Sequence, residues 1–217
     1  MIKKEIYPKT QRLKVGGDKV YVTEKLDGSN LVFFKKNDIL YVAQRKNIFS
    51  IDELENVKDI LYKGLYQWLL DNKDVLQEEL HEGSAICGEW LGMGQIKYTI
   101  DEFDKKWYMF AKARVNDDFN LSDFNYCHES FIYPFENQVI PKFVGIVPQV
   151  AELNVLPNKS YLDSIYKNYS KKVQRNVEGF IVNYKSIISK YVRMKNGKLQ
   201  EHFDRESKEV GNENKDN

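Results

Sequence analysis

The chain has 217 residues, 42% hydrophobic and 30% charged, a composition typical of a soluble globular protein with an adequate core. It lacks the run of about eighteen apolar residues needed to cross a membrane and the apolar stretch of a signal peptide, so we expect no membrane association. Cys87, Cys127 and three scattered histidines form neither a disulfide framework nor a metal-ligand spacing, which indicates a cytoplasmic location.

The net charge of +1 gives by itself no signal for nucleic-acid binding, but the charge is unevenly distributed. Residues 201–217 carry six acids and three bases, which leaves residues 1–200 with a charge of +4. This distribution allows a modest basic patch on the body of the protein.

The N-terminal third of the sequence contains patterns typical of strands. A β-branched run, Val20–Thr23, predicts a strand that ends near the Asp27-Gly28 turn. A hairpin is predicted next, with its two strands at residues 31–35 and 39–45 and its tip at residues 36–38.

A helix is predicted to follow. Ser50 and Glu53 have the spacing of a capping box. The apolar residues that follow recur at helical spacing: Leu54, Val57, Leu61, Leu65 and Trp68. Asp71-Asn72 is predicted to end this helix, and a shorter helix runs to Leu80.

The remaining elements alternate between strand and helix. Strands are predicted at residues 84–90, 107–115, 179–184 and 189–195, with a helix at 161–171 and a turn at 185–186, whereas residues 116–145 are aromatic but give no clear assignment. We therefore expect an α+β domain over residues 1–203 with mostly antiparallel sheets flanked by helices. The polar tail, 204–217, is expected to be disordered.

Lys25 stands where the first strand gives way to the Asp-Gly turn, in the order Lys25-Leu26-Asp27-Gly28-Ser29-Asn30. A lysine held by rigid backbone can act as a nucleophile once its proton is removed. The alternative is an ordinary hairpin with a solvated lysine, because Asp-Gly is a common hairpin turn.

The candidate functional residues on the later strands each have a functional and a structural interpretation. Arg45 suits a bidentate grip on a phosphate or is plain surface. Glu89, within an apolar strand, suits a ribose hydroxyl or a metal, or else faces water from an edge strand. Tyr108, Phe110 and Lys112 share a strand face by their spacing, so Phe110 either stacks on a base or packs in the core.

Three further charged candidates lie in the C-terminal part of the chain. Glu178 precedes a hydrophobic strand. Arg193 and Lys195 are two residues apart on a predicted strand and thus point to one side, as a phosphate-binding wall would need; the alternative is a solvated strand face.

In order and combination these motifs resemble the covalent nucleotidyltransferase superfamily of polynucleotide ligases and capping enzymes, from about Val20 to Lys198. The resemblance implies an ATP-grasp-like nucleotidyltransferase fold. It implies a nucleophilic Lys25, catalytic cations at Arg193 and Lys195, and nucleotide contacts from Glu24, Asn30, Arg45, Glu89, Phe110 and Glu178. Glu178 is also the expected ligand of Mg²⁺ or Mn²⁺, and Arg193 departs from the two lysines usual in its motif.

The ending Gly28-Ser29-Asn30 resembles ATP-dependent RNA ligases of the phage and RNA-editing type, which implies a role in RNA repair. The Lys- and Asn-rich composition favours a phage or viral source. Because 22 residues follow Lys195, we expect no OB-fold domain, and an accessory protein could replace a C-terminal domain.

The family reaction implies that Lys25 takes AMP from ATP, passes it to an RNA 5′-phosphate, and that a 3′-OH at an RNA end or nick then displaces AMP. The alternatives are a minimal DNA ligase without the OB domain, a capping-type enzyme that uses GTP, and a non-catalytic nucleotide- or RNA-binding module.

Overall fold

The computed structural model describes residues 19–126, 133–184, 187–195 and 198–199, with side chains up to Arg193. Contacts divide the described chain into two compact units, residues 26–149 and residues 19–25 with 150–199. The expected domain end at residue 203 and the tail after it lie outside the described residues. None of the helices in the described segments is long and apolar enough to cross a membrane.

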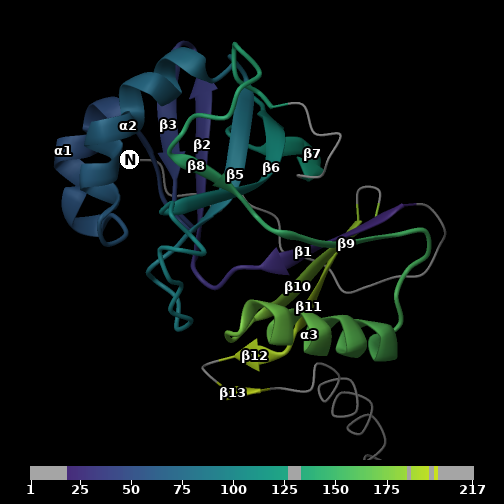
Figure 1. Cartoon of the computed structure of the whole chain (residues 1–217). Coiled ribbons are helices and arrows are strands. Elements are labelled where there is room, and N and C mark those ends of the chain that lie inside the picture. Colours follow the sequence, from purple (N-terminus) through teal and green to yellow (C-terminus); the bar gives the residue numbers. More distant parts are fainter. Residues whose placement is uncertain (1–18, 127–132, 185–186, 196–197, 200–217) are drawn as a thin grey trace, which may run out of the picture. The chain divides into compact units, whose positions relative to one another are not determined.

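The first unit is built on one large sheet (Figure 1). Its strands, helices and 3-10 helices (η) are β2 (Ser29–Lys36), β3 (Ile39–Ala43), β4 (Ile48–Ser50), η1 (Ile51–Glu53), α1 (Leu54–Val57), η2 (Lys58–Ile60), α2 (Leu65–Glu79), β5 (Ser84–Trp90), β6 (Trp107–Val115), β7 (Leu121–Tyr126) and β8 (Val144–Ile146). The strand order is β4-β3-β2-β5-β6-β7, in which neighbouring strands are antiparallel, and β8 pairs with β6 in parallel.

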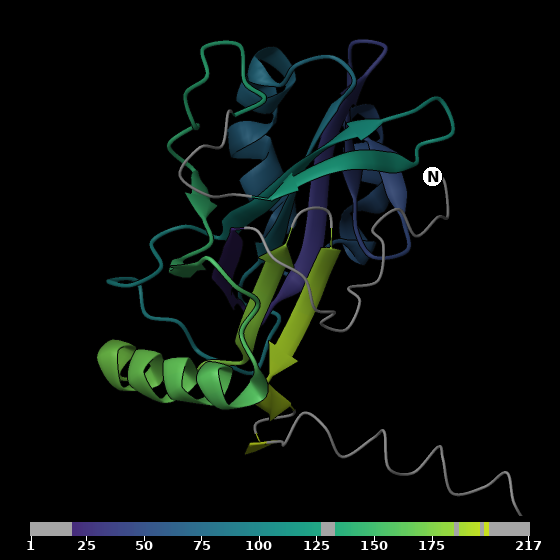
Figure 2. The same ribbon diagram turned by 90° about the vertical axis from the view of Figure 1, so that its right-hand side faces the viewer.

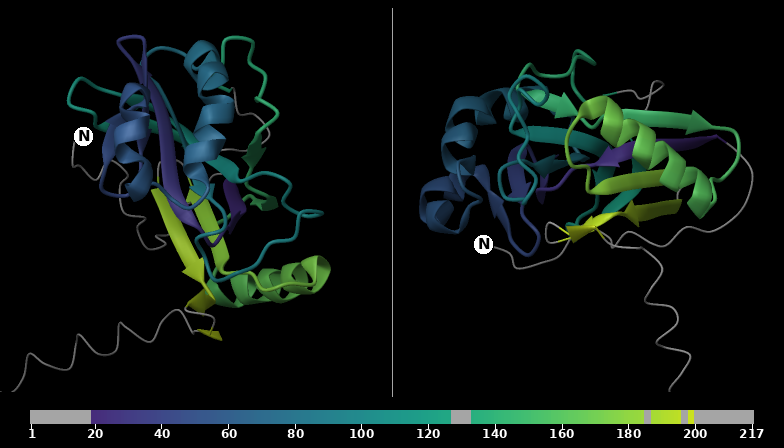
Figure 3. Two further views of the ribbon diagram at one scale, coloured as in Figure 1. Left: turned by 90° about the vertical axis from the view of Figure 1, so that its left-hand side faces the viewer. Right: turned by 60° about the horizontal axis from the view of Figure 1, so that its bottom comes forward.

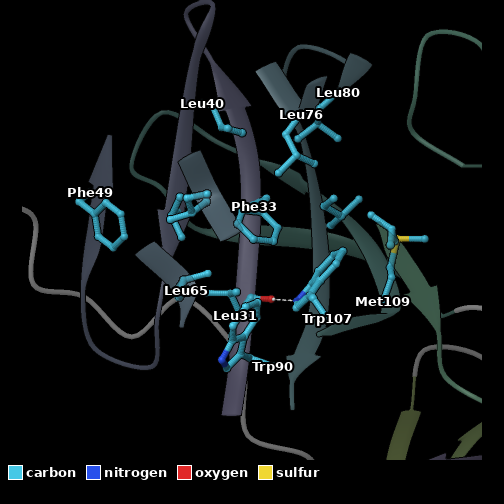
Figure 4. Packing of buried hydrophobic residues seen from close by; sticks show 14 of the residues in the cluster. Leu31, Phe33, Leu40, Phe49, Leu65, Leu76, Leu80, Trp90, Trp107 and Met109 are labelled. Atoms are coloured by element: carbon cyan, nitrogen blue, oxygen red, sulfur yellow. Dashed lines mark hydrogen bonds between the residues drawn. The ribbon is translucent and has the colours of Figure 1, made fainter. Parts of the chain in front are cut away.

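One face of this sheet packs against α2. Phe33, Ile86 and Trp107 from the strands meet Leu69 and Leu76 from the helix, and all five are fully buried. Figure 4 shows Trp107 beside Leu31, whose carbonyl oxygen accepts a hydrogen bond of 3.1 Å from the indole Nε1. Because that indole N–H is buried, the bond satisfies a donor that would otherwise destabilise the core.

The opposite face of the sheet is lined by a second cluster, centred on Val32, Phe34, Cys87, Ala111 and Ala113. It is closed by aromatic side chains that include residues of β7, the outer strand of the teal pair in Figure 2. The sheet is therefore buried on both faces over most of its length, which explains why its strands are near-continuous apolar runs.

A β-bulge in β6 changes which face its side chains occupy. Cys87 pairs with Ala111 and Gly88 pairs with Met109, so Phe110 is an extra residue on β6. Before the bulge Met109 faces α2, whereas after it Ala111 faces the second cluster. Without the bulge, two residues of the same parity would face the same side.

The second unit has a smaller sheet and one long helix. Its elements are β1 (Val20–Lys25), β9 (Gln149–Leu153), α3 (Lys159–Val173), β10 (Gly179–Tyr184), β11 (Ile187–Val192), β12 (Met194–Lys195) and β13 (Lys198–Leu199). The sheet order is β11-β10-β1-β9, with β10 antiparallel to both β1 and β11. Helix α3 covers one face through Leu162, which packs with Val22 and Phe180 (Figure 3).

The expected α+β fold with mostly antiparallel strands is confirmed. The predicted hairpin tip is also present, although Lys36 belongs to β2 and the turn consists of Asn37 and Asp38, at φ of 51° and 59°. Two residues with positive φ match the twist of a hairpin. The Asp27-Gly28 segment, by contrast, is no hairpin turn, because β1 and β2 belong to different sheets.

The predicted helical boundaries after residue 50 are wrong, although the capping box of Ser50 and Glu53 is present. The helical path stops at Leu61, which is extended with ψ of 153°, and α2 begins after Gly64 at φ of 81°. It then runs through Asp71-Asn72, where the Asn72 amide donates to the Trp68 carbonyl oxygen at 2.7 Å. That local bond lets a poor helix former remain within the helix.

We also find elements that the sequence did not indicate. β7, β8 and β9 lie in or just after the unassigned region 116–145, of which residues 127–132 are outside the described part. The predicted strand 189–195 is interrupted at Arg193, between β11 and β12. The predicted turn at 185–186 lies outside the described residues.

The contact between Gly88 and Trp107 predicts a stability effect. A Cβ on Gly88 would lie 2.4 Å from Trp107 Cε2, so Gly88→Ala should displace the indole and reduce the free energy of unfolding by about 1–3 kcal/mol in urea denaturation. Gly83→Ala is the control, because a Cβ there meets nothing within 4 Å and adds only the cost of φ at +70°, roughly 1 kcal/mol. Equal stability of Gly88→Ala and the wild type would contradict the packing described.

Candidate active site

Lys25 is the last residue of β1, and its ammonium contacts a carboxylate from the neighbouring strand. Its Nζ lies 2.5 Å from Glu178 Oε2, with 27% and 17% of the two side chains exposed. The contact follows from register, because Lys25 pairs with Gly179 at the start of β10 and Glu178 immediately precedes it. The two residues that the sequence separates by more than 150 positions are thus brought together within one unit.

Glu24 points to the opposite face of the same strand. Its side chain is completely buried, and its two oxygens accept bonds of 2.5 and 2.7 Å from the guanidinium of Arg175. Tyr169 of α3 donates a further hydrogen bond of 2.7 Å. The sequence assigned Glu24 to the nucleotide, but the structure engages both its oxygens with protein groups on the α3 side, so its carboxylate does not join Lys25.

The segment that carries Glu178 is anchored on both sides. Arg175, which binds Glu24, begins it, and the Tyr166 hydroxyl donates to the Val177 carbonyl oxygen at 2.9 Å. The Arg193 backbone N–H donates to the Glu178 carbonyl oxygen at 2.8 Å. These bonds fix the backbone from which the Glu178 carboxylate reaches Lys25.

Arg193 lies on the α3 side of the small sheet, and whether Lys195 shares that side stays a prediction. Its Nη1 lies 3.3 Å from Asp163 Oδ1, and its guanidinium lies 5.6 Å from the ring centroid of Tyr166. Both partners belong to α3, so the side chain lies on the Glu24 side of the sheet. Tyr191, two residues earlier on β11, packs in the same α3-side cluster, so Arg193 continues the alternation of that strand. Lys195 is on β12, and its side chain is outside the described residues.

Tyr191 and Asp163 interact with each other on the same α3 side of the sheet. The Tyr191 hydroxyl donates a hydrogen bond to Asp163. That bond is the main cause that lowers the pKa of Asp163, while burial raises the pKa of Tyr191. The aspartate is therefore held ionised, and it keeps Arg193 on the α3 side.

In the first unit, Asn30 and Glu89 form a pair across two strands. Asn30 on β2 lies opposite Glu89 on β5, and its Nδ2 donates to Glu89 Oε2 at 2.8 Å. Tyr108 on β6 lies opposite Glu89 in turn. The three side chains form a row on the face of the sheet away from α2. The structure thus brings together Asn30 and Glu89, which the sequence assigns to the same site.

Phe110 is the bulged residue of β6 and is half-buried. It packs against the clusters that contain Tyr108 on one side and Ala111 on the other. The bulge thereby keeps Phe110 on the face that carries Asn30 and Glu89. Lys112, which the spacing placed on that face, instead lies opposite Ile86, whose side chain belongs to the α2 side.

Arg45 is exposed and follows the end of β3. Tyr62 connects it to the row, because the Tyr62 hydroxyl accepts from the Arg45 backbone N–H at 3.4 Å and donates to the Asn30 carbonyl oxygen at 3.2 Å. Burial raises the pKa of Tyr62, so its hydroxyl remains a donor at neutral pH. The structure thus fixes the backbone of Arg45 and leaves its guanidinium at the surface.

Asp27 and Gly28 position a loop. Asp27 Oδ2 accepts from the backbone N–H groups of Gln95 and Ile96 at 2.6 and 2.8 Å, and the Asp27 N–H donates to the Tyr98 hydroxyl at 2.7 Å. A Cβ on Gly28 would lie 2.3 Å from the Trp90 carbonyl oxygen. The glycine is therefore required by its close approach to β5.

The donors near Lys25 fit a magnesium ion that is held mostly by its substrate. Among the described residues there is no group of three or more His, Cys, Asp and Glu side chains arranged to hold a metal. Mg²⁺ commonly binds one or two carboxylates, substrate phosphates and water, so the single carboxylate of Glu178 fits that pattern.

Sequence reasoning missed Arg175, Tyr169 and Tyr62. Arg175 and Tyr169 act on Glu24 from 151 and 145 residues away, and Tyr62 acts through main-chain atoms. The one available signal was the charge of Glu24 in an apolar strand, because a carboxylate there needs a partner.

The model of a protein family described as RNA ligase matches residues 18–195, which is most of the chain. That range includes both the Lys25–Glu178 pair and the Asn30–Glu89 pair. No curated protein sequence matches significantly.

Solved structures share the fold at low identity. A variant of a Naegleria gruberi RNA ligase with AMP and Mn is 18% identical, with a TM-score of 0.50 over 88% of this chain and 60% of that chain. Another variant, with ATP and Mn, is 17% identical, with a TM-score of 0.49 over 87% and 57%. A protein from Aquifex aeolicus described as an ATP-dependent DNA ligase is 17% identical, with a TM-score of 0.48 over 86% and 49%. The chain thus spans about half to three-fifths of the proteins it resembles.

The Glu24–Arg175 pair predicts a large loss of stability on neutralising Glu24. Glu24→Gln leaves the guanidinium without its counter-charge at a site where that side chain is 10% exposed, so the free energy of unfolding should fall by about 3 kcal/mol or more in urea denaturation.

Glu152→Gln is the matched control for this change. Glu152 pairs with Lys19, which is 62% exposed, so its neutralisation should cost at most about 1 kcal/mol. Similar losses in the two variants would show that the buried pair contributes no more than a surface pair.

Proposed function

The chain belongs to the RNA ligase family, and on that premise we propose that it is an ATP-dependent RNA ligase that acts through a lysyl-AMP intermediate. The observation that carries the proposal is the pair of Lys25 and Glu178, with 2.5 Å between Nζ and Oε2 at the end of a rigid strand. A fixed lysine beside a carboxylate has the two parts that nucleophilic attack requires, a nucleophile and a group that can take its proton.

In the first step, the Lys25 amine attacks the α-phosphorus of ATP. A phosphorus–nitrogen bond forms, the bond from the α-phosphorus to the bridging oxygen breaks, and pyrophosphate leaves. A free lysine has a pKa near 10.4, so a proton must leave the ammonium before attack. Glu178 is placed to accept it, because its oxygen already contacts Nζ.

In the later steps, a 5′-phosphate oxygen of RNA attacks the phosphorus of lysyl-AMP and releases the Lys25 amine. A 3′-OH then attacks the activated 5′-phosphate, forms the phosphodiester and releases AMP. Lys25 is thus regenerated, and one ATP is consumed for each bond formed.

The residues of the first unit have roles as nucleotide contacts in this proposal. Glu89, which Asn30 holds in place, is the carboxylate that would contact the ribose hydroxyls, and Phe110 offers a ring for stacking on adenine. Arg45 has an exposed guanidinium suited to a phosphate. Lys195 supplies positive charge for the phosphates, whereas Arg193 and Glu24 act as supports on the α3 side.

When bound, Mg²⁺ or Mn²⁺ supplies charge that stabilises the phosphates during transfer. Glu178 is the residue that would hold it. The AMP and Mn of the Naegleria gruberi structure are the ligands that the proposal expects.

Covalent labelling tests the nucleophile. Wild-type protein incubated with α-labelled ATP and Mg²⁺ should give a labelled band that survives denaturation and is lost in acid, and Lys25→Ala should give none. Lys19→Ala is the control, because this exposed lysine pairs with Glu152. Equal labelling of wild type and Lys25→Ala would sink the assignment, and labelling from GTP alone would identify a capping-type enzyme.

Nick sealing tests the choice of RNA. Duplexes that differ only in whether the 3′-OH strand is RNA or DNA should be sealed with a preference for RNA of roughly five- to tenfold, because one hydrogen bond to a 2′-OH contributes about 1 kcal/mol. Equal sealing of all-DNA nicks would indicate a DNA ligase.

A further inference from the structure

The chain is nearly neutral overall, but its two units carry opposite net charges. The described residues of the unit that carries Lys25 contain eleven lysines and arginines against four acids, a formal charge of +7. Those of the other unit contain thirteen bases against nineteen acids, a formal charge of −6. The net charge of the whole chain therefore does not describe how each unit interacts with a polyanion.

The two long helices show the same contrast. Helix α2, of 15 residues, contains four acids and one lysine. Helix α3 is also 15 residues long but contains four lysines and one acid, Asp163. Exposed helix surfaces ordinarily mix both signs of charge, so the composition of α3 calls for a reason.

The described acidic side chains of the unit that carries Lys25 all form ion pairs within that unit. Within the described residues, Glu24 pairs with Arg175, Glu152 with Lys19, Asp163 with Lys159, and Glu178 with Lys25. Three exposed lysines of α3 make no ion pair with any described residue: Lys167, Lys171 and Lys172.

Compensation of the helix dipole does not account for this pattern. A dipole favours cations in the last turn, where Lys171 and Lys172 stand, but it equally favours acids in the first turn. The first turn of α3 has no acid and instead begins with Lys159. Lys167 stands at the ninth position, outside the last turn.

We propose that the exposed face of α3, formed by Lys167, Lys171 and Lys172, binds the phosphate backbone of the RNA substrate. The neutral side chains exposed beside them, Ser164 and Asn168, are hydrogen-bond donors of the kind that also contact phosphates. The proposal rests on the proposed function for the identity of the polyanion.

The position of α3 decides which step this surface affects. Glu24 and Lys25 point to opposite faces of β1, and Glu24 points to α3. The lysines lie on the outer side of that helix, behind the strand that carries the nucleophile. They therefore hold RNA away from the reacting phosphate, and their loss weakens RNA binding while the transfer of AMP to Lys25 continues.

The experiment uses the full chain with three lysines changed to glutamine, which preserves helix propensity. Variant one is Lys167→Gln, Lys171→Gln and Lys172→Gln. The matched control is Lys58→Gln, Lys63→Gln and Lys142→Gln, which makes the same change in net charge at exposed lysines of the other unit. A third variant carries arginine at the three α3 positions. Binding of a fluorescently labelled RNA oligonucleotide is measured against salt, and ATP labelling is measured in parallel.

The α3 glutamine variant should bind RNA on the order of tenfold more weakly, with a salt slope smaller by about 2, because each single-strand phosphate contact contributes about 0.7. The arginine variant and the control should bind as the wild type does, and all should label with ATP. An unchanged slope, or an equal loss in the control, would overturn the proposal. RNA binding through α3 in a wild type that ATP fails to label would overturn the proposed function and leave this surface standing.

Discussion

The buried ion pair of Glu24 and Arg175 is the constraint on which the geometry at Lys25 depends. A charge on a fully buried side chain is tolerated only with a partner, and Arg175 and Tyr169 satisfy both oxygens. Because neighbouring residues of a strand point to opposite faces, fixing Glu24 toward α3 fixes Lys25 toward the other side. The same arginine begins the segment that carries Glu178. One interaction thus positions both members of the Lys25–Glu178 pair.

Each unit carries its own set of polar residues. The smaller unit carries the Lys25–Glu178 pair and a net positive charge, whereas the larger one carries the Asn30–Glu89 pair with its aromatic neighbours. In each unit, the polar residues stand on one face of a sheet whose other face packs against a helix.

Local patterns predicted the strands Ser84–Trp90, Trp107–Val115 and Gly179–Tyr184 at their observed bounds, because apolar runs between turn residues are a local signal. The helical prediction after Ser50 failed because an extended Leu61 and a left-handed Gly64 leave the hydrophobic spacing unchanged. The predicted strand 189–195 is interrupted at Arg193, because a pattern of alternation does not show where a strand breaks. The partner of Glu24 lies 151 residues away, and such pairing is decided by tertiary structure alone.

The bulge at Phe110 divides β6 into two segments of opposite phase. Up to Met109 the odd-numbered residues face the helix, and from Ala111 onward they face away from it. A comparison of related sequences by simple hydrophobic alternation would therefore misread one half of the strand. Because Phe110 is the extra residue, its deletion alone would leave Cys87 opposite Ala111 and keep Tyr108 opposite Glu89. The bulge thus adds an aromatic side chain to the strand without changing the pairing on either side of it.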